Sequence, residues 1–195
     1  VIKTYEYTGN YLIVLIHTAY DIPSITADGI ETLSDKDMTI TYLKEVTTGS
    51  SAGTYTEVDE CKDAGNYKIR VTGKGNYSGS FDLSYTIQQR NLNEVAEDYR
   101  FAIEPISDQT YTGDAIIPEE LKVFEYAYDA SAPDDKSNEN AVLGEDDYNV
   151  TGTNNIDVTS DIQKAELTIE GKGNYTGTLT TEFVILPKNI NDKTD

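Results

Sequence analysis

Residues 73–79 read GKGNYSG and residues 171–177 read GKGNYTG, so nearly the same seven-residue motif occurs twice, 98 residues apart. The residues in front of each copy also match, with YKIRVTG at 67–73 aligned with AELTIEG at 165–171. In both segments apolar residues alternate with polar ones, which is typical of a β-strand with one buried face. A motif that recurs together with its flanking pattern indicates an internal repeat. The sequence therefore predicts two copies of one domain.

Weaker matches extend the repeat in both directions. The segments after the motif keep the offset of 98 residues, whereas two upstream matches need offsets of 110 and 104, so loops of unequal length separate them. We therefore expect equivalent strands joined by loops that differ between the copies. The aligned pairs are SFDLSYTI at 80–87 with TLTTEFVI at 178–185, LSDKDMTITY at 33–42 with LGEDDYNVTG at 143–152, and EYTGN at 6–10 with TYTGD at 110–114.

The repeat sets the expected domain boundaries. Residues 1–89 form the first repeat, which is expected to be truncated at its N-terminus, and residues 90–195 form the second. The second repeat is expected to carry an acidic insertion loop at 130–147. The segment 90–109 reads as a linker between the repeats. KNINDKTD at 188–195 resembles the start of that segment, so a further linker is expected to begin there.

The composition favours strands throughout the chain. Tyr occurs 15 times and Thr, Val and Ile recur, while the better helix formers are sparse. Short alternating runs separated by turns that contain Gly and Asn are typical of antiparallel sandwiches. We therefore predict an all-β fold of two tandem immunoglobulin-like antiparallel β-sandwich domains. The expected strands cover 11–19, 38–46, 66–72, 80–87, 116–128, 148–151, 164–170 and 178–186.

The repeated motif is interpreted as a hairpin turn. Glycine reaches positive φ without a steric penalty, Asn tolerates the left-handed region, and a Tyr ring can cover the end of a sandwich. A phosphate-binding loop is the alternative, but such a loop needs a helix after its glycines, and here a strand pattern follows. The predicted turn residues are Gly73, Gly75, Asn76, Tyr77 and Gly79 in the first copy, and Gly171, Gly173, Asn174, Tyr175 and Gly177 in the second.

The charge balance excludes several classes of function. There are 15 Lys and Arg against 35 Asp and Glu, a formal net charge of −20 that would repel phosphate backbones and anionic lipid. One Cys and one His exclude an internal disulfide and the zinc sites built from several Cys and His. No apolar run reaches the roughly 20 residues that a transmembrane helix needs. We expect no nucleic-acid binding and no membrane insertion in this segment.

Few residues are candidates for catalysis. His17 lies in the apolar run YLIVLIHTA and is expected to be a core or edge side chain rather than a general base. Cys61, in VDECKDAG, is expected to be a thiol in a loop or at a strand edge. DAGNYKIRV at 63–71 is similar to the tyrosine corner of immunoglobulin-like domains, in which a Tyr hydroxyl fixes the preceding loop. No catalytic residue is predicted.

Carboxylates are the remaining candidate ligands. Hard oxygen groups suit Ca²⁺, but no stretch has the spacing of a calcium-binding loop, so a solvated acidic loop is the alternative interpretation. No other cofactor is expected. The calcium candidates are Asp134, Asp135, Glu145, Asp146 and Asp147 in the acidic stretch, with Glu139 beside them and Asp35 and Asp37 in the first repeat.

Together these motifs resemble the tandem immunoglobulin-like repeats of large bacterial cell-surface and adhesin-like proteins. The resemblance covers nearly all of the second repeat and the C-terminal half of the first, whereas YLIVLIHTAYDIP at 11–23 departs from it. It implies an exported β-sandwich module, strung in arrays, that carries no catalytic residues. The matching residues are YTG at 111–113, IP at 117–118, LGEDDYNVT at 143–151, NN at 154–155, GKGNYTGT at 171–178 and FVI at 183–185.

The expected function is that of a non-enzymatic structural or adhesive spacer, located outside the cell at the bacterial surface. Its expected partners are neighbouring repeats of the same chain, and the protein is expected to be a monomer. A module that binds a glycan or a host surface protein is the alternative, since rings of the 15 Tyr could stack on sugars. A Lys–Asn isopeptide crosslink, which some surface domains carry, stays open because the sequence singles out no buried Lys.

Overall fold

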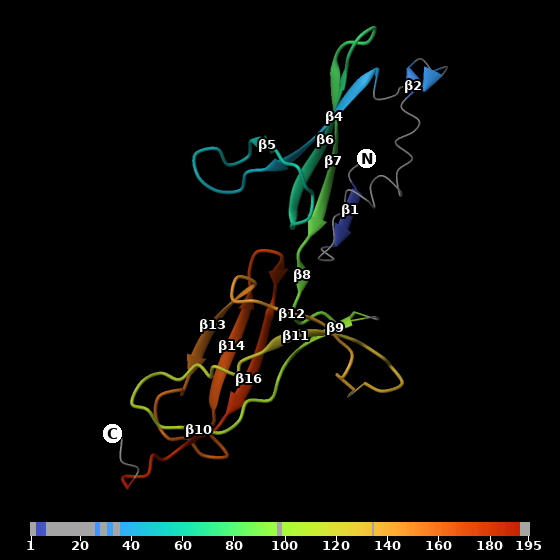
Figure 1. Ribbon diagram of the computed structural model, residues 1–195. Helices are drawn as coiled ribbons and strands as arrows, with labels where there is room; N and C mark the ends of the chain where they lie inside the picture. Colours follow the sequence, from blue (N-terminus) through green and yellow to red (C-terminus); the bar gives the residue numbers. More distant parts are fainter. Residues whose placement is uncertain are drawn as a thin grey trace. The chain divides into compact units, whose positions relative to one another are not determined.

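The fold was analysed on a computed structural model, which describes residues 3–6, 26–27, 31–32, 36–96, 99–133 and 135–191. This part of the chain contains strands and turns and no helix, which confirms the predicted all-β class (Figure 1). Most of the strand pairs are antiparallel, in agreement with a β-sandwich class. The chain separates into two compact units, Val1–Gln89 and Arg90–Asp195, and each is described by itself.

Unit 1 is built on one five-stranded sheet with the order β1-β7-β6-β4-β5. Strand β1 runs parallel to β7, whereas β7, β6, β4 and β5 pair antiparallel. Two short strands, β2 and β3, form a separate antiparallel pair. The strands are β1 (Lys3–Glu6), β2 (Thr26–Ala27), β3 (Glu31–Thr32), β4 (Met38–Glu45), β5 (Tyr55–Glu57), β6 (Gly65–Gly73) and β7 (Ser80–Gln88).

The core of unit 1 lies on the predicted face of β6 and β7. Tyr67, Ile69, Tyr85 and Ile87 are buried in one cluster with Cys61, and the Tyr67 and Tyr85 rings stack with 5.3 Å between their centroids. The stripe continues along β7 to Phe81 and Leu83, which remain 45% exposed. The apolar run at 11–19, including His17, lies outside the described residues, so its predicted strand is not tested.

Unit 2 contains two three-stranded antiparallel sheets and two short parallel pairs. One sheet has the order β12-β11-β9 and the other the order β13-β14-β16, while β10 pairs with β17 and β8 pairs with β15. The strands are β8 (Arg90–Asn91), β9 (Tyr99–Ile103), β10 (Gln109–Thr110), β11 (Val123–Ala127), β12 (Glu139–Val142), β13 (Tyr148–Thr153), β14 (Ala165–Gly171), β15 (Tyr175–Thr176), β16 (Thr178–Phe183) and β17 (Ile185–Leu186).

The core of unit 2 follows from the period-2 pattern of β14, on which Ala165, Leu167 and Ile169 are fully buried. Strand β9 of one sheet lies beside β16 of the other. Phe101 on β9 meets the ring of Tyr175 edge to face, with 5.8 Å between the centroids. Phe101 of the β12-β11-β9 sheet therefore packs against β15, the short strand of the GKGNY turn that carries Tyr175.

The pairing registers of the two units repeat the sequence offsets. Met38 pairs with Gly73 in unit 1, and Tyr148 pairs with Gly171 in unit 2. Met38 and Tyr148 are 110 residues apart, whereas Gly73 and Gly171 are 98 residues apart. On the parallel edge, β1 runs beside β7 as β10 runs beside β17. The same strands therefore meet in both units, although the loops between them differ in length.

Three sequence-based boundaries are wrong. The presumed linker at 90–109 contains β8, β9 and the first residue of β10, and it belongs to the fold of unit 2. The acidic stretch at 130–147 is not a loop throughout, because 139–142 form the edge strand β12 against β11. The strand expected at 116–128 begins only at Val123, because the Leu121 amide closes a turn on the Pro118 carbonyl.

Candidate functional site

The two GKGNY turns have the same backbone geometry. Gly75 and Gly173 have φ of +67° and +65°, and Gly79 and Gly177 have φ of +90° and +79°. In unit 1 the Gly73 amide donates to the Gly79 carbonyl at 3.0 Å, and in unit 2 the equivalent bond spans 2.9 Å. The residue after the first glycine also makes the same bond in both turns. The Lys74 amide donates to the Asp37 carbonyl and the Lys172 amide to the Asp147 carbonyl, both at 2.8 Å. Each motif is a hairpin turn, not a phosphate loop before a helix.

The turns differ in what covers them. In unit 1, Asn76, Ser78 and Gly79 are exposed and Tyr77 is half-buried. In unit 2, Tyr175 is buried and the turn forms β15, which pairs with β8. A side chain on Gly79 would meet no atom within 4 Å, whereas one on Gly177 would collide with the Asn91 side chain. Unit 2 therefore uses its turn as a seat for residues 90–93.

Residues 90–93 (RNLN) bind to the turn of unit 2 through backbone hydrogen bonds. The Arg90 amide donates to the Asn174 carbonyl at 3.0 Å, and the Leu92 amide donates to the Thr176 carbonyl at 2.8 Å. The Leu92 side chain is only 1% exposed. The Asn93 amide donates to Asn91 Oδ1 at 3.3 Å, which closes a local Asx turn. The sequence predicts a linker at these residues, whereas the structure includes them in the fold of unit 2.

Arg90 is the most buried cation that the structure describes, and it is held from several sides. Its guanidinium forms an ion pair with Glu125 of β11, and both side chains are about one-tenth exposed. The guanidinium carbon lies 3.7 Å from the centroid of the Tyr99 ring and 5.5 Å from that of Phe101. The Asn140 side-chain amide donates to the other Glu125 oxygen at 3.2 Å. This cage fixes the start of unit 2 to both β9 and β11.

In unit 1 the resemblance to a tyrosine corner corresponds to a real bond. The Tyr67 hydroxyl donates to the Asp63 carbonyl at 2.8 Å, so the buried ring of β6 holds the preceding loop. Desolvation by burial raises the pKa of Tyr67 well above its usual value. In unit 2 the equivalent position is Ala165, and no such corner exists there. The corner is therefore a feature of unit 1 alone.

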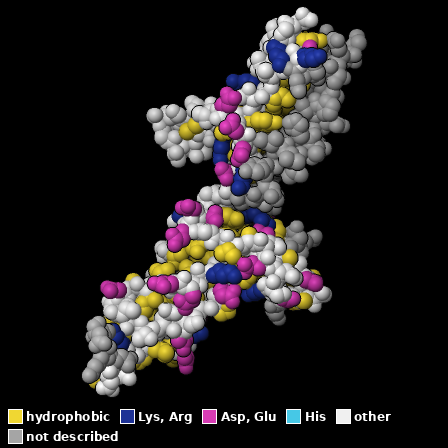
Figure 2. Space-filling model, in the orientation of Figure 1, with side chains coloured by type: hydrophobic (Ala, Val, Ile, Leu, Met, Phe, Trp, Pro, Cys, Tyr) yellow, Lys and Arg dark blue, Asp and Glu magenta, His cyan; other side chains and the backbone are white. Residues whose placement is uncertain are grey.

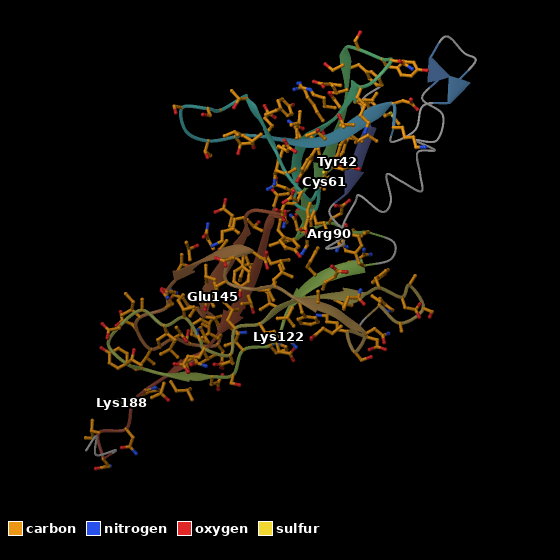
Figure 3. All side chains as sticks on the ribbon, turned by 45° about the horizontal axis from the view of Figure 1, so that its top comes forward. Tyr42, Cys61, Arg90, Lys122, Glu145 and Lys188 are labelled. Atoms are coloured by element: carbon orange, nitrogen blue, oxygen red, sulfur yellow. The ribbon has the colours of Figure 1, made fainter. Side chains whose placement is uncertain are left out.

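Cys61 lies in the loop between β5 and β6, in agreement with the sequence-based expectation of a loop or strand-edge thiol, and this loop turns its side chain into the core. The thiol is fully buried in one cluster with the stacked Tyr67 and Tyr85, and Tyr42 packs against this cluster (Figure 3). Desolvation by burial raises the pKa of Cys61, while a hydrogen bond with Tyr85 and the charge of Lys44 oppose the change. A neutral buried thiol is a poor nucleophile. Cys61 therefore acts as a core side chain.

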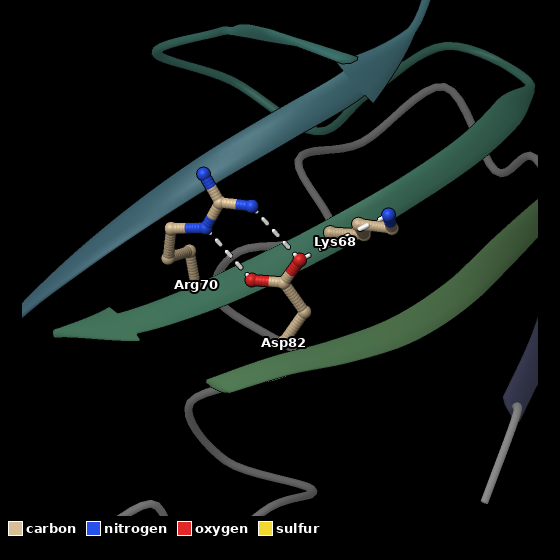
Figure 4. Close-up of polar contacts among 3 residues, drawn as sticks. All are labelled: Lys68, Arg70 and Asp82. Atoms are coloured by element: carbon tan, nitrogen blue, oxygen red, sulfur yellow. Dashed lines mark hydrogen bonds and ion pairs between the residues drawn. The ribbon is translucent and has the colours of Figure 1, made fainter. Parts of the chain in front are cut away.

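A surface ion pair joins the two long strands of unit 1 (Figure 4). Arg70 on β6 faces Asp82 on β7 in register, and its Nε and Nη2 donate to the two carboxylate oxygens at 2.8 and 2.9 Å. Lys68 Nζ lies 3.9 Å from the same carboxylate. The hydrogen bond with Arg70 lowers the pKa of Asp82. The geometry is that of a cross-strand pair that supports the sheet.

The calcium candidates do not converge among the described residues. No group of three or more Asp, Glu, His or Cys side chains there could hold a metal ion. Asp135 caps the Ser137 amide, and Asp147 accepts the Gly144 amide at 2.9 Å, so both serve local turns. Glu139 pairs with Lys122 across the sheet. Glu145 and Asp146 are exposed, and Asp134 and Asp35 lie outside the described residues.

Among the open hollows on the described surface of unit 2, one is formed by residues between 152 and 163. Its volume is about 510 Å³, and its lining is mostly amide, hydroxyl and aliphatic groups with no aromatic ring. Where burial is described, each Tyr side chain is buried or half-buried, and Tyr148 lines another hollow with Ile117 and Val150. The lining residues are Gly152, Asn154, Asn155, Ile156, Asp157, Val158, Thr159, Ser160 and Gln163.

Two further features bear on surface function. On the face of unit 2 that Figure 2 shows, acidic side chains are spread out with Lys and Arg among them, so the negative charge on this face does not gather in one patch. Where burial is described, no Lys is buried, and the one buried carboxylate, Glu125, pairs with Arg90. These residues therefore offer no buried Lys for an isopeptide crosslink.

The described residues include no helix long and apolar enough to cross a membrane. A scan against protein-family models finds no match for the chain. A search of curated proteins finds no significant match either.

Proposed function

We propose that this chain is a non-enzymatic segment of a bacterial cell-surface protein, in which immunoglobulin-like β-sandwich modules act as structural or adhesive spacers. The observation that carries the proposal is the matched pair of GKGNY turns. They share φ angles and hairpin hydrogen bonds at an offset of 98 residues, and the strand that pairs with each of them is offset by 110 residues. Two self-contained units of one design are what a spacer requires, since each can fold alone and add length.

The chemistry of the described residues supports a mechanical rather than a catalytic role. The buried polar groups, Arg90, Glu125 and Asn155, all have partners that fix strands or loops to one another. Cys61 is enclosed in the core. Such groups fix strands and loops to one another, and none of them is an activated nucleophile or an acid–base pair at a surface.

Single-molecule pulling tests the spacer role. Each unit should unfold in its own step, with about 290–320 Å of extended chain from Val1–Gln89 and about 350–380 Å from Arg90–Asp195, less the folded end-to-end distances. One step, or steps that divide elsewhere, would contradict two independent modules. Antibody labelling of intact source cells, with and without protease treatment, tests the surface location. Label found only after lysis would contradict that location.

A ligand-binding module for a glycan or host protein is the second candidate. The hollow lined by Asn154, Asn155 and Gln163 favours it, because amide groups bind sugar hydroxyls and the exposed Ile156 and Val158 add apolar contact. A glycan array followed by titration calorimetry tests this function. Binding that is lost on Gln163→Ala would support it, and an array without signal at high protein concentration would count against it.

A further inference from the structure

A hollow of about 330 Å³ lies in unit 2, where the start of β13 meets the turn that precedes β11. Tyr148 and Val150 form one side of it, since residues two apart face the same side of a strand. The other side is the turn in which the Leu121 amide donates to the Pro118 carbonyl at 3.1 Å. We refer to this cavity as the Tyr148 hollow. Its remaining lining residues are Ile117, Glu119 and Glu145.

The Tyr148 hydroxyl has no hydrogen-bond partner among the residues that the structure describes, although the side chain is only 8% exposed. A buried Tyr hydroxyl ordinarily finds a partner, because an unpaired polar group loses its hydration without compensation. Desolvation by burial raises the pKa of Tyr148, and the charges of Glu145 and Asp147 add to this effect, so the hydroxyl lies near these carboxylates. It is therefore available to a ligand in the hollow.

The fold does not require this hydroxyl. Tyr148 pairs with Gly171, and in unit 1 the same register position holds Met38, which pairs with Gly73. Met38 is 6% exposed, so an apolar side chain fills this position as completely as Tyr148 does. Packing therefore accounts for the ring of Tyr148 but not for its polar atom.

Two carboxylates and a set of apolar side chains complete the site. Glu119 and Glu145, which lies just before β13 (Figure 3), are exposed, and neither forms an ion pair or hydrogen bond with another described residue. The other lining side chains besides Tyr148 are apolar, and they range from buried to 45% exposed. An ammonium group offers three donors to hydroxyl and carboxylate oxygens, and the alkyl stem of a Lys side chain packs on apolar surface. The chemistry of the hollow therefore matches a Lys side chain.

We propose that the Tyr148 hollow binds the side chain of a lysine presented by a basic partner protein. The alkyl stem packs on the apolar lining, and the ammonium group donates to the Tyr148 hydroxyl and to the carboxylates of Glu119 and Glu145. The net charge of −20 attracts a basic partner at long range, and the two carboxylates repel an anionic one. This surface is distinct from the hollow at 152–163 and does not depend on the spacer function.

The test is an NMR titration of the full ¹⁵N-labelled chain with the end-blocked peptide Gly-Lys-Gly at constant ionic strength. A single side chain must offset the loss of translational freedom, so a dissociation constant on the order of 10 mM is expected. The peptide should progressively shift the amides of Leu121, Tyr148 and Val150. The same peptide with its Lys side chain acetylated keeps the stem but loses the charge, and it should bind at least about tenfold more weakly. The salt n-butylammonium chloride, which represents the side chain alone, should shift the same amides.

Substitutions separate the hydroxyl from the charge. Tyr148→Phe keeps the ring and should weaken binding of Gly-Lys-Gly about threefold to tenfold, because the ammonium loses one acceptor. Glu145→Gln changes an exposed side chain, so the fold is kept, and it should weaken binding about twofold to fivefold. Asp146→Asn is the matched control, since it removes the same charge one residue away and outside the lining. It should change the affinity by less than about twofold.

Several outcomes would overturn the proposal. These are the absence of shifts with Gly-Lys-Gly, equal binding of the acetylated peptide, and binding of n-butylammonium without binding of the peptide. An unchanged affinity of Tyr148→Phe, or equal losses for Glu145→Gln and Asp146→Asn, would overturn it as well. Its failure would leave the pulling result and the glycan array untouched, because neither measurement depends on the Tyr148 hollow.

Discussion

The buried pair of Arg90 and Glu125 gives the sharpest test of how unit 2 is held together. Replacement of Arg90 by Met removes the charge but keeps an unbranched apolar stem beside Tyr99 and Phe101. Glu125 then stays enclosed, with the Asn140 amide at 3.2 Å as its remaining donor. Breaking a buried pair from one side costs about 3–5 kcal/mol, because the other charge is left uncompensated. We expect a loss of this size in the free energy of unfolding of unit 2.

A double-mutant cycle separates the pair from its surroundings. Glu125→Leu alone should cost about as much as Arg90→Met, since it leaves a buried guanidinium. Arg90→Met combined with Glu125→Leu should cost less than either single change, because apolar replacement of both partners is often close to neutral. The aromatic neighbours at 3.7 and 5.5 Å favour this outcome, since they offer the Met side chain an apolar wall.

The assay must resolve the two units. The chain has no Trp and its Tyr residues occur in both units, so optical probes report them together. Hydrogen exchange read by mass spectrometry in increasing urea gives separate stabilities, with β14 peptides reporting unit 2 and β6 peptides serving as the internal reference. Single variants that each cost below about 1 kcal/mol, or costs that simply add, would refute the reasoning that this pair is buried and coupled.

Three further outcomes are expected. Tyr67→Phe should lower the stability of unit 1 by about 1 kcal/mol by removing the bond to the Asp63 carbonyl, and an unchanged urea midpoint for β6 would contradict this. Gly173→Ala should cost about 1–2 kcal/mol because φ is +65°, with Gly173→Asn costing less; equal costs would exclude the backbone as the cause. Burial raises the pKa of Cys61, so the unfolded thiol ionises first as pH rises. Unit 1 should therefore lose stability above about pH 8.5, where the unfolded thiol ionises. Cys61→Ala should reduce the slope of the free energy of unfolding against pH, and equal slopes in the two proteins would contradict a raised pKa of Cys61.

The sequence predicted those elements whose information is local. The alternation of Tyr67, Ile69 and Val71 identifies β6, and all three are buried. The glycine spacing of the turns specifies backbone angles that only glycine adopts readily. Such signals do not depend on distant residues, so a single sequence is enough to predict the strand and the turns.

The errors have a common physical cause, which is that distant partners decide the outcome. The four residues of β12 are all exposed, so no apolar alternation marks them, and pairing with β11 makes the strand. The loop position of Cys61 was expected, but its burial was not, because its sequence neighbours are polar and the Tyr67 bond to the Asp63 carbonyl holds this loop over the core. Arg90 looked like a linker cation because its partner Glu125 lies 35 residues away. Only the match between RNLN and KNIN pointed to a specific role for that segment.

The glycines of the two turns meet different demands, and this decides which residues carry information about docking. Gly79 and Gly177 both have strongly positive φ, so the hairpin alone accounts for glycine at each position, whether or not a segment is seated beside it. Gly177 has the added requirement of room for Asn91. The shared backbone shape of the two turns therefore does not indicate whether a segment is docked on either of them. The residues that report docking in unit 2 are those of the incoming segment, because Leu92 is 1% exposed and the Leu92 amide donates to the Thr176 carbonyl.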